Sequence, residues 1–584
     1  MRPKRRERAR TTGLLRRPTR PQCATQAKRR EFVGGLPGAP VLVKGTGVER
    51  TSGPSARRTS AAARVGLVFF GLLVGVGMLL VAEGLLRLAG VAPARRDPFA
   101  GFGDSRPVFE RVERKDGMAV WRTAVARGLP HSEEFLADKP ADGFRVFVVG
   151  ESSAAGVPYP ATQAFSAWLA RRLQGSLPGR PIEVVNAAIP GYASRRVLGV
   201  VREVTAYEPD LLIVYAGHNE FAESRQYQHL LEMDPRLFRL RVLLSSTRLY
   251  GVLERALGWD APRQVDFDDI EDAKQMFAVA DERLAGTAYP SERERGWGEQ
   301  HYRWNLEEMA RLMQDSGART VFVSLGQNFS DWAPGASQHR AGLEAAELAR
   351  WEEQVAAGRG HAVAGDCARA LDSFEQAIEI DDQHAQLYFE LAVCAERQGE
   401  RQRAALAYLR ASNLDRVPHG APSSFNDIIQ EAAESSNSLF VDGAAALAAG
   451  SSRPLPGDDL FVDPMHPNLR ANQILAASIA DALRQAGLPA PSAEWAEAPQ
   501  DPPVEEILAA DPSLRRQERL VRAASCALAR RDACALAELD VVLADEPEHA
   551  WARQLREVVA RRSSPGEVPG LALKRPPSST RPPS

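Results

Sequence analysis

Five short, largely apolar runs constrain the fold of this chain more strongly than any other feature of its sequence. They occupy residues 144–150, 182–188, 211–217, 320–326 and 438–442. A strand with one face in water alternates apolar and polar residues, whereas largely apolar runs are expected when helices cover both faces of a sheet. Because helix-prone segments separate the runs, the pattern predicts an α/β fold with a doubly wound, parallel, five-stranded sheet.

Residues able to carry chemistry follow several of these runs. They are Gly150-Glu151-Ser152-Ser153, Gly191, Gly217-His218-Asn219-Glu220, Gln327-Asn328 and, far downstream, Asp463-Pro464-Met465-His466. The carboxyl ends of parallel strands meet at one edge of a sheet, so these blocks are expected to lie close together. Acyl transfer needs a nucleophile, a base that takes its proton, a group that orients the base, and donors for the oxyanion. The blocks contain residue types for all four roles.

The order and local context of these blocks resemble the SGNH/GDSL hydrolase family, whose sheet is flavodoxin-like. The family's Gly-Asp-Ser register falls on Gly150-Glu151-Ser152, so the resemblance implies that Ser152 is the nucleophile, with Ser153 as the competitor. Glu151 stands where the family usually has aspartate. Both remaining triad members come from one Asp-x-x-His stretch in this family, which implies Asp463 as the orienting group and His466 as the general base.

The resemblance also implies three oxyanion donors: the backbone N–H of Ser152, Gly191 and the side-chain amide of Asn219. Glycine at 191 lets the backbone approach a substrate closely. Each such donor typically contributes roughly 3–4 kcal/mol to transition-state stabilisation. We interpret His218 as a loop residue beside the site; the alternative is a second general base.

Gln327 and Asn328 end the fourth run at the same edge of the sheet. They are candidates for substrate contact, and a polar turn at the end of a strand explains them equally well. No cluster of cysteine and histidine has the spacing of metal ligands, so we expect neither a metal nor a cofactor.

One uncharged stretch near the N-terminus predicts a membrane anchor. Residues 65–82 contain no charged side chain and would span about 27 Å as a helix. A buried core helix and a cleaved signal peptide are weaker explanations. Residues 1–64 contain 17 basic and three acidic residues, a net charge of +14, which leaves −16 for the rest of the chain. The positive side is expected to stay in the cytoplasm, with the remainder exported to the periplasm of a bacterium, a source that only the family resemblance implies.

The five cysteines are Cys23, Cys367, Cys394, Cys526 and Cys534. In this topology all but Cys23 lie in an oxidising compartment, where disulfides are permitted. The expected positions on neighbouring helices predict two bridges, Cys367–Cys394 and Cys526–Cys534. The alternative is that these cysteines are small buried apolar residues.

A spacing of 34 residues repeats within 345–416. Gly365, Ala370, Phe374, Ala377 and Asp381 recur as Gly399, Ala404, Tyr408, Ala411 and Asp415. This period resembles the tetratricopeptide repeat, a helix–turn–helix unit that stacks on its neighbours. Residues 513–562 resemble a more degenerate copy. Such repeats imply a protein or peptide partner, with a structural brace as the alternative.

The sequence therefore predicts a modular, single-pass protein of the inner membrane. The expected parts are a disordered basic arm (1–64), a transmembrane helix (65–88), a hydrolase domain (91–490) with insertions at 221–300 and 345–416, a helical repeat-like segment (500–562) and a disordered tail (563–584). Residues 91–140 are expected to be a connecting segment with one or two helices. The 221–300 insertion is either a lid over the substrate or a solvated helical excursion.

The expected activity is hydrolysis of an ester or acylated substrate. The alternatives are transfer of an acyl group to an envelope polysaccharide by the same triad, and a non-catalytic repeat scaffold. The acidic main body argues against nucleic acid as a partner.

Overall fold

The computed structural model describes residues 61–89, 91, 107–124, 132–221, 244, 247–257, 292–489 and 495–562. It contains two compact units, Met1–Gly75 and Val76–Ser584. The predicted basic arm up to residue 60, the predicted tail 563–584 and most of the predicted 221–300 insertion lie outside the described residues. Within that insertion the structure describes the helix α8 (Arg248–Leu257) and the start of α10 (Glu292–Asp315).

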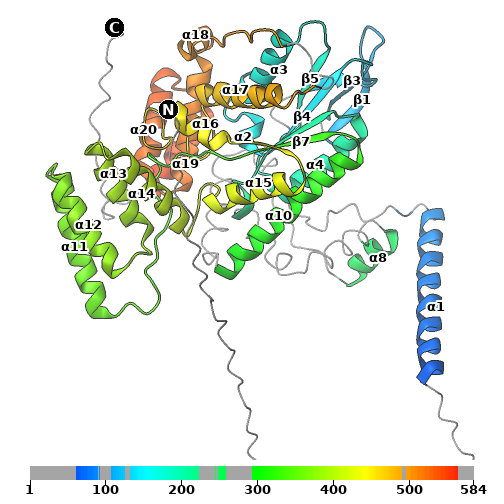
Figure 1. Ribbon diagram of the computed structural model, residues 1–584, viewed down its shortest axis with the longest axis horizontal. Coiled ribbons are helices and arrows are strands. Elements are labelled where there is room, and N and C mark those ends of the chain that lie inside the picture. The colour runs from blue at the N-terminus through cyan, green and yellow to red at the C-terminus, as the bar shows by residue number, and fades with distance from the viewer. Residues whose placement is uncertain are drawn as a thin grey trace, which may run out of the picture. The chain divides into compact units, whose positions relative to one another are not determined.

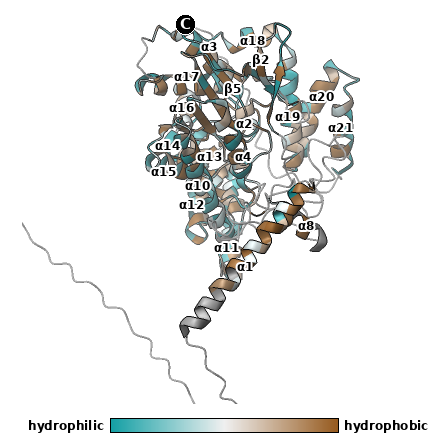
Figure 2. Ribbon diagram, turned by 90° about the vertical axis from the view of Figure 1, so that its right-hand side faces the viewer, coloured by the Kyte–Doolittle hydropathy of each residue, from teal (hydrophilic) through white to brown (hydrophobic). Residues whose placement is uncertain are grey.

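The apolar stretch near the N-terminus forms the helix α1 (Ala61–Leu88), whose described part is predominantly hydrophobic (Figure 2). Within it, Phe69–Leu88 is long and apolar enough to cross a membrane, judged by length and composition. Large apolar side chains such as Phe70, Met78 and Leu80 are exposed, whereas in a core helix they would be buried. The chain therefore contains one candidate membrane-spanning helix among its described residues.

The predicted sheet is confirmed. Its five parallel strands run in the order β5 (Ile182–Asn186), β4 (Phe144–Gly150), β6 (Leu211–Tyr215), β7 (Arg319–Val323) and β8 (Leu439–Val441). Every residue of β4 and β6 is buried. These central strands have covered faces on both sides, which explains why their sequences are apolar rather than alternating.

Helices cover the two faces of this sheet (Figure 1). On one face α3 (Phe165–Ser176) packs against α17 (Leu469–Gln485), and α16 (Gly443–Gly450) packs against α17. On the other face α10 packs between α4 (Ser194–Val204) and α15 (Ser423–Ser435). Short helical turns fill the links: α2 (Ser152–Ala155), η2 (Ala161–Gln163) and η3 (Thr205–Tyr207).

The expectation of a helical connecting segment at 91–140 is wrong for its described part. Residues 109–136 contribute an antiparallel sheet of β1 (Phe109–Glu113), β2 (Ala119–Thr123) and β3 (Glu134–Leu136). The reason is aromatic packing: Phe109 and Phe135 are buried and meet Phe147 of β4 edge-to-face, with ring centroids 6.3 and 5.3 Å away. These few buried aromatic residues attach the small sheet to the main core. The sequence of the segment shows no clear alternation of apolar and polar residues that would have predicted its strands.

The 345–416 insertion forms two helical hairpins, α11 (Ala345–Val363) with α12 (Cys367–Ile380) and α13 (Ala385–Arg397) with α14 (Arg401–Leu414). They have a hydrophobic core of their own, in which Phe374 and Tyr408 are buried. Gly358 permits close helix packing, because a Cβ there would lie 2.4 Å from the Phe374 ring. The repeating small and aromatic positions thus occupy the helix interfaces.

The two repeated aspartates hold the segment that enters the hairpins. Asp381 accepts a hydrogen bond from the backbone N–H of Arg340, at 3.2 Å. Asp415 accepts from the backbone N–H groups of Gly335 and Ala336, at 2.8 and 3.0 Å. Both carboxylates are buried, so they act as internal caps for the loop 335–340 rather than as surface charges.

The C-terminal segment is also helical, with α18 (Val504–Ala510), α19 (Ser513–Leu528), α20 (Asp532–Asp545) and α21 (Ala550–Arg562). Leu514 of α19 belongs to the main core, whereas Ala523 and Ala527 face a third apolar cluster that includes Trp332. The helix α19 therefore lies between the domain of the five-stranded sheet and the last two helices.

The predicted bridge Cys526–Cys534 is confirmed and joins α19 to α20, with Cα atoms 5.9 Å apart. The other predicted bridge is not formed in the structure. Cys367 and Cys394 are buried thiols whose sulfurs lie 3.0 Å apart. Burial, together with the neighbouring Cys367, raises the pKa of Cys394 to about 12, so this thiol stays protonated at neutral pH.

We predict that breaking the α19–α20 bridge lowers stability measurably. The bridge joins residues that are eight positions apart, and the double variant Cys526→Ser, Cys534→Ser should lose roughly 2–3 kcal/mol of unfolding free energy. Urea unfolding with and without reductant measures this. Reductant should destabilise the wild type and leave the double variant unchanged. Equal unfolding midpoints for oxidised and reduced wild type would contradict the prediction.

Candidate active site

The turn after β4 places Ser152 at the carboxyl edge of the sheet. Gly150 is required there, because a Cβ would lie 2.0 Å from the carbonyl oxygen of Tyr215 in the neighbouring strand β6. The chain then enters α2 at Ser152, and Gly156 closes this single turn with φ +95°. The close approach of β4 and β6 thus holds the residue immediately before the turn rigidly in place.

Ser152, His466 and Asp463 form one hydrogen-bonded chain. The hydroxyl Oγ of Ser152 lies 2.8 Å from Nε2 of His466, and Nδ1 of His466 lies 2.7 Å from Oδ2 of Asp463. The serine and the histidine are separated by 314 positions. Three residues that the sequence analysis singled out therefore meet with the geometry that a nucleophile, a base and an orienting carboxylate require.

Asp463 is a buried, ionised carboxylate, only 1% exposed. Its Oδ1 accepts from the backbone N–H groups of Met465 and His466, at 3.0 and 2.9 Å. Its Oδ2 accepts from the hydroxyl of Ser525 at 2.7 Å, besides contacting His466. Burial opposes the charge, but the His466 ring, the Ser525 hydroxyl and the Met465 N–H outweigh it and lower the pKa of Asp463 to about 2.

The loop that carries Asp463 and His466 is fixed at both ends. The backbone N–H of Val462 donates to the carbonyl of His466 at 2.9 Å. Asn468 caps α17 by accepting from the N–H of Ala471 at 3.0 Å. The buried amide of Asn472 donates to Pro467 O and accepts from the N–H of Phe165, which ties the loop to α3. The imidazole is therefore held by packed secondary structure on both sides.

Glu151 organises the loop that follows β6. It is fully buried and accepts from the backbone N–H groups of Gly217, His218 and Asn219, at 3.2, 2.7 and 3.0 Å. Burial raises the pKa of Glu151 to about 8, and the charge of Glu220 adds to this, although the three N–H donors lower it. Glutamate is one methylene longer than the aspartate usual in the resembling family. Here the longer side chain connects the turn after β4 to the loop after β6.

The three candidate oxyanion donors lie on neighbouring loops. Gly191 has φ +74°, a conformation that side chains disfavour. The amide of Asn219 donates to the carbonyl of Tyr192, next to Gly191, at 3.1 Å. Within the described part of the chain, the backbone N–H groups of Ser152 and Gly191 donate to no backbone carbonyl. Both remain available to a negatively charged oxygen.

His218 is buried and neutral. The backbone N–H of Ala421 donates to its Nδ1 at 3.1 Å, so the ring proton resides on Nε2. Burial and the charge of His466 lower the pKa of His218 to about 3. A ring that stays neutral and uses its unprotonated nitrogen in the fold is poorly suited to act as a second general base.

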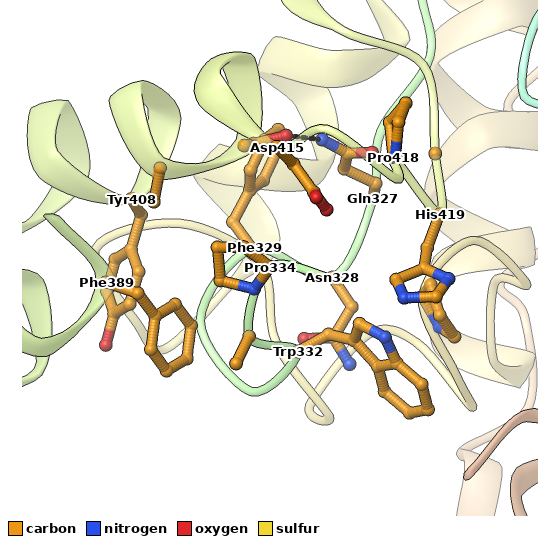
Figure 3. Close-up of a pocket in the computed structure, with 15 residues that line it drawn as sticks. Gln327, Asn328, Phe329, Trp332, Pro334, Phe389, Tyr408, Asp415, Pro418 and His419 are labelled. Atoms are coloured by element: carbon orange, nitrogen blue, oxygen red, sulfur yellow. Dashed lines mark hydrogen bonds between the residues drawn. The ribbon is translucent and has the colours of Figure 1, made fainter. Parts of the chain in front are cut away.

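Gln327 and Asn328 line a small pocket beside the loop of Asp463 (Figure 3). Its walls combine the end of β7 with the second hairpin, and include Trp332, Tyr408 and Pro464. Both amides are engaged by the protein, since Gln327 donates to Ser412 and Asn328 donates to Asp458. Contact with substrate stays a prediction for these two residues.

Ser525 is the main residue of this site that the sequence analysis missed. It sits in α19, more than 60 positions after Asp463, and no motif surrounds it. Its only signal was proximity in sequence to Cys526, whose bridge was predicted. A single serine contributes no recognisable pattern, so its contact with the triad carboxylate is visible only in three dimensions.

A doubly wound parallel sheet with a hydrogen-bonded serine, histidine and aspartate at its carboxyl edge has the arrangement expected of a serine hydrolase. The sequence model of the GDSL-like lipase/acylhydrolase family matches residues 148–378. The chain thus contains a domain of this family and is an ester-hydrolysing enzyme. The matched range ends before Asp463 and His466, which follow the inserted hairpins.

Solved structures with a similar chain path are distant in sequence. An α/β hydrolase from the metagenome of Lake Arreo, Spain, has 13% identity and a TM-score of 0.28 over 59% of this chain and 96% of its own. An acetylxylan esterase from Geobacillus stearothermophilus has 13% identity and a TM-score of 0.27 over 59% of this chain and 96% of its own. A GDSL-like lipase from Parabacteroides merdae has 9% identity and a TM-score of 0.29 over 59% of this chain and 97% of its own. No curated protein sequence matches the chain. Similarity at this level assigns it no substrate.

We predict that Glu151 makes stability depend on pH between about 4.5 and 8. Its pKa is about 8 in the folded chain against an ordinary value of 4.5, so over this interval the folded state binds a proton that the unfolded state has lost. The unfolding free energy should therefore fall as pH rises, with a contribution of up to about 1.4 kcal/mol per pH unit.

The variant Glu151→Gln removes this titration, and Glu110→Gln, at an exposed carboxyl of β1, is the matched control. Urea unfolding across this pH range should show a shallower pH dependence only for Glu151→Gln. Identical slopes for wild type and Glu151→Gln would contradict the assignment.

Proposed function

We propose that the protein is a membrane-anchored, exported serine hydrolase that cleaves an ester through an acyl-enzyme on Ser152. The observation that carries the proposal is the unbroken path from Ser152 Oγ through His466 to Asp463, with contacts of 2.8 and 2.7 Å. In a hydrolase domain, a serine hydroxyl at hydrogen-bond distance from such a pair is the expected nucleophile.

In the first half-reaction, Nε2 of His466 removes the proton from Ser152 while Oγ attacks the ester carbonyl. Asp463 holds Nδ1–H of the imidazole and balances the positive charge that develops on the ring. The carbonyl oxygen becomes an oxyanion, which accepts from the N–H groups of Ser152 and Gly191 and from the free amide hydrogen of Asn219. The tetrahedral intermediate collapses, and the imidazolium gives its proton to the departing alcohol.

In the second half-reaction, His466 takes a proton from water as the water attacks the acyl carbon on Ser152. The same donors stabilise the second oxyanion, and the proton on His466 returns to Ser152 as the acid leaves. Transfer of the acyl group to a sugar hydroxyl instead of water would use the same residues. Faster turnover of an activated ester upon addition of sugar acceptors would identify that transferase activity.

We predict that Ser152→Ala lowers turnover of a p-nitrophenyl ester by roughly 10⁴–10⁶-fold with folding intact. The variant removes the nucleophile and leaves the binding surface unchanged. Steady-state kinetics and circular dichroism measure activity and fold. A stopped-flow burst of nitrophenol should appear in the wild type and vanish in the variant.

Ser153→Ala is the matched control one position away. Ser153 is buried and donates to the carbonyl of Met465 at 3.0 Å, so its hydroxyl is engaged in supporting the loop of His466. Its loss should cost far less activity than the loss of Ser152. An inactive Ser153→Ala together with an active Ser152→Ala would show that Ser153, and not Ser152, is the nucleophile. Retained activity in both would exclude an acyl-enzyme on either serine, whereas a wild-type protein without esterase activity would favour the non-catalytic repeat scaffold.

The proposed location rests on the helix Phe69–Leu88 and on the charge step across it. The segment is apolar enough to span a bilayer, and residues 1–64 carry a net charge of +14. Positive charge favours retention of the amino-terminal side in the cytoplasm. The hydrolase domain would then lie in the periplasm, attached to the inner membrane.

A pair of reporters tests this topology. Alkaline phosphatase, which is active only after export, should be active when fused after Ser584, whereas green fluorescent protein at the same position should be dark if secreted unfolded. Deletion of residues 65–88 should reverse both signals. Activity of the cytoplasmic reporter alone in the full-length fusion would exclude an exported catalytic domain.

We further propose the domain organisation expected from the sequence: a hydrolase domain over 91–490, interrupted at 345–416, followed by a helical segment over 500–562. The repeat hairpins resemble tetratricopeptide units and are candidates for a peptide partner. A bracing role is supported by Arg453, which binds Glu396 of the second hairpin at 2.7 Å and also pairs with Asp331.

A further inference from the structure

The C-terminal helices contribute a side chain to the carboxylate of Asp463. The hydroxyl of Ser525, in the last turns of α19, donates to Oδ2 at 2.7 Å. The helix lies outside the residues matched by the hydrolase family model, 148–378. We propose that Ser525 is a positioning residue of the active site, which holds Asp463 in the orientation that binds His466. The inference rests on the proposed triad.

The pattern of donors around Asp463 supports a specific role for Ser525. Oδ1 is held by the two backbone N–H groups of Met465 and His466. Oδ2 is the oxygen that contacts the imidazole, and its other donor is Ser525. Backbone donors therefore fix one oxygen, and a single side chain from a separate segment fixes the oxygen that faces His466. Hydrogen bonds to a charged acceptor are shorter and stronger than neutral ones.

Several contacts independent of Ser525 anchor α19 against the hydrolase domain. Glu518 pairs with the hydroxyl of Tyr159, and Arg522 binds Asp458 at 2.6 Å. The disulfide at Cys526 joins α19 to α20 directly beside Ser525. These anchors set the position of the serine, and they persist when its hydroxyl is removed. A loss of activity in Ser525→Ala would therefore not come from release of the helix.

The chemistry predicts an effect on turnover rather than on binding. Asp463 stabilises the imidazolium, which exists only in the transition states and intermediates, so a misoriented carboxylate raises the barrier without changing ground-state contacts with substrate. We expect Ser525→Ala to lower kcat for a p-nitrophenyl ester roughly tenfold and to change KM less than twofold.

Two further variants separate this role from a purely structural one. Ser525→Thr keeps the hydroxyl and should retain kcat within about threefold of wild type. Ser513→Ala makes the same substitution on the same helix, where the hydroxyl binds Asp511 instead, and should leave kcat unchanged. Thermal unfolding of all variants measures any loss of stability. An unchanged kcat in Ser525→Ala, a rise in KM alone, or an equal loss in Ser513→Ala would overturn the proposal.

A double-mutant cycle with Asp463→Asn tests whether Ser525 acts through the carboxylate. The rate of fluorophosphonate labelling of Ser152 reads out nucleophile activation even in slow variants. Adding Ser525→Ala to Asp463→Asn should change that rate less than twofold, whereas an additional tenfold loss would place its effect elsewhere and overturn the proposal. Full activity in Asp463→Asn alone would instead refute the triad. A slow Asp463→Asn with a fully active Ser525→Ala would refute only the positioning role.

Discussion

The hydrogen bond between Asp463 and His466 is the interaction on which the rest of the site depends. It requires a negative charge at a position only 1% exposed, and an isolated carboxylate there would be expensive to desolvate. Two backbone N–H groups, the imidazole and the hydroxyl of Ser525 together meet that cost. All of these donors must be held in place. The loop that carries Asp463 and His466 is accordingly bonded to the start of α17, and α19 packs beside it and supplies Ser525. The charge, once held, keeps the imidazole turned so that its Nε2 faces Ser152.

A second buried carboxyl group organises the opposite side of the site. Glu151 comes one residue before Ser152 and accepts from three consecutive backbone N–H groups after β6. It thereby couples the position of the candidate nucleophile to the loop that carries Asn219. The two acids have opposite pKa shifts, to about 2 for Asp463 and about 8 for Glu151. The difference follows from their partners, because Asp463 faces an imidazole that can carry positive charge whereas Glu151 has neutral donors and the negative Glu220 nearby.

Much of this arrangement could be predicted from sequence because it depends on local patterns. The apolar runs gave the parallel sheet, since burial on both faces leaves a direct trace in composition. The Gly-x-Ser and Asp-x-x-His blocks pointed to residues that the structure brings together, because each block is short and sits at a strand or helix end. The small antiparallel sheet at 109–136 was missed, as a few aromatic contacts define it rather than a period. Ser525 was missed for a related reason: one hydroxyl reaching across from a separate helix has no local signature. The unbonded pair Cys367 and Cys394 shows that neighbouring helix positions bring two sulfurs close without making them a bridge.

We propose that Ser152 is the nucleophile activated by His466, and covalent labelling of the intact protein can show this. A fluorophosphonate probe reacts with an activated serine and stays attached, so digestion and mass spectrometry of the labelled protein identify the residue. We expect one probe per chain, on Ser152, with labelling abolished in His466→Ala while the fold is retained. A probe found on Ser153 or another serine, or labelling of Ser152 at the same rate in His466→Ala, would contradict it.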